Sequence, residues 1–147
     1  MRIFLDTNVL LSGLLGRGLC RDLLDLVVER HTLVLSEQVL RESERHLRRK
    51  FGVPASERRA FAFLMREVAE VVPDAEPPAG VRVPDPDDRA IVGAAIAAGA
   101  ACLVTGDSAL LRMVAPEGLP VRSPREAWVL LRDPGVGPAP WHGRGPA

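Results

Sequence analysis

Short apolar runs that favour β-strands alternate along this chain with longer stretches of helical periodicity. The clearest runs span residues 3–5, 31–35 and 101–105, and each is followed by a segment whose apolar residues recur three and four positions apart. Strands alternating with helices are typical of a parallel sheet, because a parallel connection needs a crossover, usually a helix. We therefore expect an α/β domain built on a mainly parallel sheet.

The remaining elements follow from the same periodicity and from capping residues. Ser36 stands where a helix N-cap belongs, and Pro124 opens the last helix. Residues 73–87 contain five prolines and one glycine, which predicts a loop within the domain that carries a short strand at 81–83. We expect helices over residues 9–15, 20–30, 36–50, 56–71, 87–99, 108–114 and 124–131, and a final strand at 121–123.

The length of 147 residues fits one domain, which we expect to span residues 1–131. Residues 132–147 hold four prolines and four glycines. Such a composition buries too little apolar surface to fold, so we expect a disordered carboxyl-terminal tail there.

Charge, hydropathy and cysteine content limit what the chain can bind and in which compartment it is expected. Nineteen basic residues balance nineteen acidic ones, so the chain lacks the strongly basic footprint of many nucleic-acid binders. No apolar run approaches the length of a membrane span, and an acid at position 6 argues against a secretory signal. Cys20 and Cys102 have no metal-type spacing, and reduced thiols in the cytoplasm are their expected state.

Two of the expected strands end next to an acid. Asp6 follows the first strand, and Asp107 follows the run at 101–105. In parallel sheets, ligands bind beyond the carboxyl ends of the strands, so both side chains would reach one crevice. Asp is also a good helix N-cap, and capping remains an alternative role for each residue.

Two further acids point toward the same end of the sheet. Asp88 lies one turn before the apolar stripe of its helix, and Asp87 could cap that helix and leave Asp88 free. Glu42 follows Val39 by three residues, on the expected sheet side of its helix. A helix cap for Asp88 and a plain surface position for Glu42 remain the alternatives.

Several carboxylates at one place repel one another. A like-charge pair at about 4 Å costs about 4 kcal/mol at an effective dielectric near 20, so such a cluster needs protons or a cation. Because unperturbed carboxyl pKa values lie near 4, a hard divalent ion is the more natural neutraliser at neutral pH. All-oxygen ligands favour Mg²⁺ or Mn²⁺ over Zn²⁺, and the three histidines are scattered along the chain.

Four sequence blocks carry a resemblance to a known family. They are DTNVLLSGLL at residues 6–15, SEQVLRE at 36–42, DPDDRAIVGAAIAAGA at 85–100 and CLVTGDSALL at 102–111. In order and spacing they resemble the PIN-domain nucleases, and they look closest to the VapC-like toxins of toxin–antitoxin systems. The resemblance implies a three-layer α/β/α sandwich with a metal-dependent ribonuclease site, whose products carry a 3′-hydroxyl and a 5′-phosphate.

The resemblance also implies roles for individual residues. Asn8 and Thr105 match polar residues that support the site, and Asp87 matches a paired acid that helps or replaces its neighbour. The residues that match the family's catalytic acids, and that are expected to hold Mg²⁺ or Mn²⁺, are Asp6, Glu42, Asp88 and Asp107.

Partners follow from the same resemblance. An RNA substrate, a cognate antitoxin protein and a second copy of the chain are expected, with no membrane contact. Side chains suited to RNA phosphates, or alternatively to a solvated face, are those of Arg41, Arg45, Arg48 and Arg49. Apolar residues of the first two helices that form either a dimer surface or core are Val9, Leu10, Leu14, Leu19 and Leu23.

Other functions stay open from the sequence. One is a PIN-fold module that binds RNA or protein without cutting, and another is a different Mg-dependent α/β phosphohydrolase. A haloacid-dehalogenase-like phosphatase needs Asp where Asn8 stands, and a receiver domain needs a late lysine, whereas the chain's one lysine is Lys50. A dinucleotide or P-loop site needs a glycine-rich turn after the first strand, which this chain lacks.

Overall fold

A five-stranded sheet forms the centre of the fold in this computed structural model, which describes residues 1–133. Its strands are all parallel and are ordered β3-β2-β1-β4-β5. The strands are β1 (Arg2–Leu5), β2 (Thr32–Ser36), β3 (Glu70–Val72), β4 (Cys102–Val104) and β5 (Val121–Arg122). Ile3 in the central strand is in register with Leu33 of β2 and with Cys102 of β4. The carboxyl ends of β1 and β4 therefore lie side by side.

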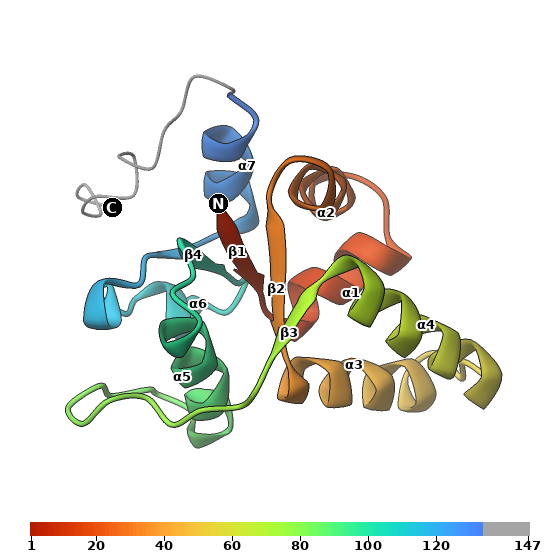
Figure 1. Cartoon of the computed structure of the whole chain (residues 1–147), viewed down its shortest axis with the longest axis horizontal. Coiled ribbons are helices and arrows are strands. Elements are labelled where there is room, and N and C mark those ends of the chain that lie inside the picture. The colour runs from red at the N-terminus through yellow and green to blue at the C-terminus, as the bar shows by residue number, and fades with distance from the viewer. Residues whose placement is uncertain (134–147) are drawn as a thin grey trace.

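Helices cover both faces of this sheet (Figure 1). They are α1 (Thr7–Leu15), α2 (Leu19–Arg30), α3 (Glu37–Arg49), α4 (Ala55–Val68), α5 (Arg89–Ala97), α6 (Ser108–Leu111) and α7 (Pro124–Leu131), with 3₁₀ turns η1 (Pro86–Asp88) and η2 (Pro116–Gly118). On one face α2 packs against α1 and α7, and on the other α5 packs against β2 and β4. The expected three-layer α/β/α sandwich with a short parallel sheet is confirmed.

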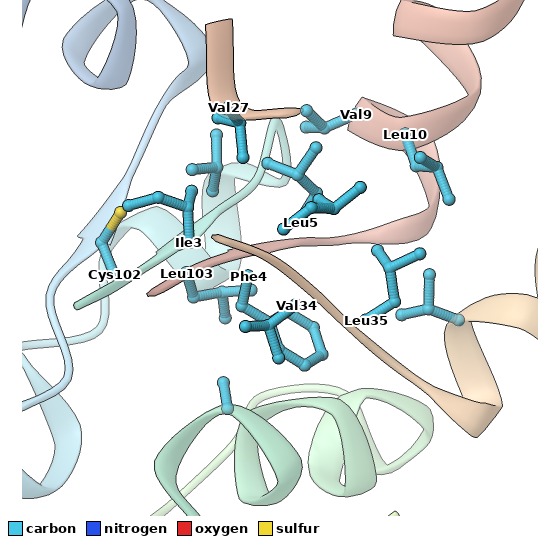
Figure 2. Packing of buried hydrophobic residues seen from close by; sticks show 14 of the residues in the cluster. Ile3, Phe4, Leu5, Val9, Leu10, Val27, Val34, Leu35, Cys102 and Leu103 are labelled. Atoms are coloured by element: carbon cyan, nitrogen blue, oxygen red, sulfur yellow. The ribbon is translucent and has the colours of Figure 1, made fainter. Parts of the chain in front are cut away.

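Alternate residues of β1 serve the two faces of the sheet. Figure 2 shows Leu5 and Val9 on one side of the strand and Phe4 with Val34 on the other, facing α5. Residues 3–5 are all fully buried. Burial on both faces explains why this strand is a continuous apolar run rather than an alternating one.

Two expectations for the segment before η1 are wrong. The helix expected over 56–71 ends at Val68, and Glu70–Val72 form β3 instead. The β-branched side chains of Val71 and Val72 suit a strand, and the segment pairs in register with the end of β2. In the described chain, residues 81–83 form no strand, because prolines before and after them remove backbone donors that a strand needs.

Three of the apolar residues considered for a dimer surface belong to the core. Val9, Leu10 and Leu23 are at most 3% exposed, so they are not available to a partner. No helix within residues 1–133 is long and apolar enough to cross a membrane. The tail expected over 132–147 lies, from residue 134 onward, outside the described residues.

Candidate active site

Asp6 and Asp107 stand beyond the carboxyl ends of the two adjacent strands β1 and β4. Asp6 directly follows β1, and its backbone N–H donates to the Val104 carbonyl at 3.1 Å. This bond extends the β1–β4 pairing by one residue and places Asp6 at the shared edge of the sheet. The crossover rule for parallel sheets thus brings together two acids that are 101 positions apart in sequence.

Both acids also cap helices. The Asp6 carboxylate accepts the Val9 N–H at 3.0 Å at the start of α1. The Asp107 carboxylate accepts the N–H groups of Ala109 at 2.8 Å and Leu110 at 3.3 Å at the start of α6. Capping and a place in the crevice are therefore compatible, because one carboxylate oxygen serves the helix and the group retains further acceptor capacity.

Glu42 and Asp88 line the same small cavity as the two strand-end acids. The cavity measures about 90 Å³, and Asn8 and His46 also line it. Glu42 comes from α3, and Asp88 stands at the junction of η1 and α5. The structure thus gathers all four acids around one opening, which we call the acidic cavity.

Two residues not expected at the site hold the Glu42 carboxylate. The Thr7 hydroxyl donates to one oxygen at 2.7 Å, and the Gln38 amide donates to the other at 2.9 Å. Gln38 also donates to the Asp87 backbone carbonyl at 2.7 Å, which ties α3 to η1. The helical spacing of Gln38 and Glu42 was available in the sequence, whereas the Thr7 contact depends on how α1 packs on α3.

Thr105 connects the two strand-end acids. Its buried hydroxyl donates to the Asp6 carboxylate and accepts the Asp107 backbone N–H at 3.0 Å. A single hydroxyl therefore fixes the orientation of one carboxylate and the position of the other residue's backbone. The supporting role expected for Thr105 stays a prediction, and these two contacts are the means by which it would act.

Burial and mutual repulsion make the acidic cavity costly for negative charge. Burial raises the pKa of Asp6, partly offset by the hydrogen bonds from Thr105 and Val9, and the nearby Asp107 and Glu42 charges raise it further. The pKa of Asp88 rises to about 6, first through burial and then through neighbouring carboxylates. A bound cation would relieve both effects.

The donor set suits a hard divalent cation in its chemistry. Four carboxylates face one opening, and carboxylate oxygens are the ligands that Mg²⁺ and Mn²⁺ prefer. Within residues 1–133, no three acidic, histidine or cysteine side chains already converge as a ligand set. In this arrangement the carboxylates of Asp6, Glu42 and Asp107 are instead engaged in hydrogen bonds within the protein.

Two of the supporting residues expected from the sequence lie differently from each other. Asn8 is exposed and lines the acidic cavity. Asp87 is exposed and lines an adjoining cavity instead.

The suggestion that Asp87 caps the helix is wrong, because Asp85 accepts the Asp87 N–H at 2.9 Å and begins η1. Asp88 is nevertheless left without a capping bond in the described chain.

The arginines of α3 lie on the exposed side of the helix near this site. Arg41 and Arg45 line the adjoining cavity of about 440 Å³, and Arg41 forms an ion pair with Asp74 at 2.5 Å. Among residues 1–133, no acidic side chain pairs with Arg45 or Arg48. Arg49 is exposed at the end of the helix.

Comparisons with known proteins agree with this architecture. The family model described as PIN domain matches residues 2–109. The chain is similar to a chain in the crystal structure of VapBC2 from Rickettsia felis bound to a DNA fragment from their promoter. That match has 18% sequence identity and a TM-score of 0.59, and it covers 84% of this chain and 98% of the other. A search of curated proteins found no match.

Proposed function

Because the chain belongs to the PIN domain family of nucleases, we propose that it is a metal-dependent endoribonuclease and the toxin of a toxin–antitoxin pair. One observation carries the proposal. Four acids from four separate segments line a single cavity at the carboxyl end of the sheet. The nuclease domain would span residues 1–131, which include the whole match to the family model.

The catalytic roles are assigned to the four acids. Asp6, Glu42, Asp88 and Asp107 would hold one or two divalent cations. Bound there, Mg²⁺ or Mn²⁺ would supply Lewis acidity for activating water and polarising the scissile phosphate. Supporting residues would orient these acids: Thr105 for Asp6 and Asp107, Thr7 and Gln38 for Glu42, with Asn8 at the rim and Asp87 beside it.

The RNA strand would meet the protein through its phosphates along α3. Arg45 and Arg48 are the better placed pair, since neither is neutralised by an acid in the described chain. Arg41 shares its charge with Asp74, and Arg49 extends the row. Phosphate contacts position a strand without reading its sequence.

The proposal includes partners and a setting. A cognate antitoxin protein is supported by the resemblance to VapC-like toxins and by the solved VapBC2 relative. A homodimer is a further part of the proposal. A cytoplasmic setting is supported by Cys20 and Cys102, which form no disulfide.

The test is cleavage of a mixed RNA pool by the purified full chain in Mn²⁺ or Mg²⁺, with EDTA as the first control. Asp6→Asn should lower the cleavage rate at least about 100-fold and leave the fold intact by circular dichroism. Asp25→Asn, at an exposed acid of α2, is the matched control and should cleave like the wild type.

Two results would contradict the proposal. Equal cleavage with and without EDTA would rule out metal dependence. Full activity of Asp6→Asn in metal-replete buffer would rule out the assigned catalytic site. RNA binding without any cleavage, by the wild type in either metal, would favour a non-catalytic binding module.

A further inference from the structure

A groove with partly apolar walls adjoins the acidic cavity. It lies between α1, the start of α2 and the end of α3, and its volume is about 620 Å³. It shares Asn8 and His46 with the acidic cavity, so the two openings are neighbours. We call it the Phe51 groove; its lining residues are Asn8, Leu11, Ser12, Leu15, Gly16, Arg17, Leu19, Cys20, His46, Lys50 and Phe51.

Two exposed apolar side chains in this groove are not used by the core. Phe51 is 55% exposed and Leu15 is 49% exposed. Both line the groove, where a flat apolar group could cover them. Removing such surface from water is favourable, which gives the groove an affinity for an occupant with an apolar face.

A capped turn at the end of α3 holds one wall of the groove in shape. Gly52 adopts a φ of 61°, and its N–H donates to the Arg48 carbonyl at 3.2 Å. The next N–H, of Val53, donates to the Leu47 carbonyl at 2.9 Å. This C-terminal capping pattern fixes the turn that carries Phe51, so the ring is presented by ordered backbone.

The charge of the groove differs from that of its surroundings. Its lining, all within the described residues, includes Arg17 and Lys50 and no acidic residue. The cavity that Glu42 lines together with Arg41 and Arg89 contains acids instead, and ion pairs with Asp74 and Glu76 neutralise these two arginines.

A strand with a phosphate at the acidic cavity must continue past it. The Phe51 groove is the side that has cations without carboxylates, and a polyanion is repelled least there. A nucleotide combines a flat apolar ring face with an anionic phosphate, which are the two chemistries that the groove presents.

We propose that the Phe51 groove binds one unpaired nucleotide of the RNA substrate, adjacent to the phosphate at the acidic cavity. Its base stacks on Phe51, and Lys50 and Arg17 contact the neighbouring phosphates. Asn8, Ser12 and His46 offer hydrogen-bonding groups to the edge of the base, so this nucleotide contributes sequence preference. The inference rests on the proposed ribonuclease function and adds the substrate element that the site reads.

The direct test measures binding of fluorescent single-stranded RNA hexamers by anisotropy. Asp6→Asn protein with Mn²⁺ serves as the non-cleaving background, and an abasic ribose-phosphate hexamer is the second ligand. Adding Phe51→Ala should weaken binding of the base-bearing hexamer about fivefold to a hundredfold. It should leave binding of the abasic hexamer unchanged.

Phe63→Ala is the matched control, because Phe63 on α4 is 69% exposed and lies outside the groove lining. This variant should bind both hexamers like the background protein. Phe51 is also largely exposed, so neither substitution is expected to unfold the chain, and equal melting curves would establish this.

A second readout uses the active protein. Sequencing the ends of a cleaved RNA pool should show a redistribution of cleavage sites for Phe51→Ala and none for Phe63→Ala. Unchanged sites together with unchanged hexamer affinity would overturn the inference while leaving the ribonuclease function intact. If Phe51→Ala no longer binds a protein partner but binds RNA unchanged, the inference is also overturned, and the groove is a binding site for a peptide. If the wild type neither binds nor cleaves RNA, the proposed function fails and the inference with it.

Discussion

The hydroxyl of Thr105 donates a hydrogen bond to the Asp6 carboxylate, although the two residues are 99 positions apart in the sequence. The same oxygen accepts the Asp107 N–H. Parallel pairing of β1 with β4 places these groups together, with Leu5 opposite Val104. The candidate site is therefore supported by the sheet itself, and its geometry depends on this strand pair.

Replacing Thr105 by Val removes the hydroxyl and keeps the shape of the side chain. The Asp6 carboxylate then keeps the Val9 N–H but loses its side-chain donor, and the Asp107 N–H loses its acceptor, so we expect RNA cleavage to fall about 10- to 100-fold. Thr105→Ser keeps the hydroxyl and should retain most of the activity. Initial rates at saturating Mn²⁺ measure the effect, and equal loss in both variants would show that packing rather than the hydroxyl matters.

Metal binding should stabilise the folded chain. At a Mn²⁺ concentration near 100 times Kd, binding to the folded state alone contributes about 2.7 kcal/mol. For a domain of this size we expect a rise in Tm of about 5 °C or more. Asp107→Asn should lose most of this rise, whereas Asp25→Asn should keep it. Differential scanning fluorimetry measures it, and an equal rise in all three proteins would place the metal elsewhere.

Asp88 should make the stability of the metal-free chain depend on pH. Its pKa is raised from 3.8 to about 6, with burial as the largest cause. The stabilising contribution of its protonated form is thus complete below about pH 4 and is lost as the pH rises through 6.

In EDTA at pH 8, Asp88→Asn should be more stable than the wild type, because asparagine carries no charge at any pH. We expect a difference of about 1 kcal/mol, well below the full linkage value, since water screens the partly exposed carboxylate. The difference should vanish near pH 4. Urea unfolding measures it, with Asp87→Asn as an exposed control; a gain that is the same at both pH values would refute the electrostatic cause.

Gly93 on α5 is required by a close approach of the loop that precedes η1. A Cβ at this position would lie 1.9 Å from the Ala75 carbonyl oxygen, and backbone must shift to admit it. We expect Gly93→Ala to lower the free energy of unfolding by about 3 kcal/mol. Gly106→Ala is the control, since nothing lies within 4 Å of its added Cβ. Denaturant titration of both variants in EDTA compares them.

Local patterns predicted the fold well where an element is defined by its own residues. The capping role of Ser36 is confirmed by the bond from the Val39 N–H to its side chain at 3.3 Å. The helix that opens at Pro124 ends at Leu131 as expected. By contrast, local periodicity extends the helix to residue 71, whereas Glu70–Val72 form a strand, because their conformation depends on pairing with β2.

The candidate site divides in the same way. Residue order predicts that Asp6 and Asp107 lie near strand ends, because both acids follow apolar runs. Residue order does not predict which residues hold Glu42, since the Thr7 contact joins α1 to α3 and spans 35 positions. The role of Asp85 in starting η1, in place of Asp87, likewise follows from backbone geometry.

Residue order alone accounts for the alternation of strands and helices, the two acids at strand ends and the family resemblance, because each depends only on residues that are neighbours in the chain. The distances among the four acids, the side chains that hold them and the groove beside them come from the folded arrangement. These features arise from packing between elements far apart in the chain, and local preference contains no information about which distant elements will meet.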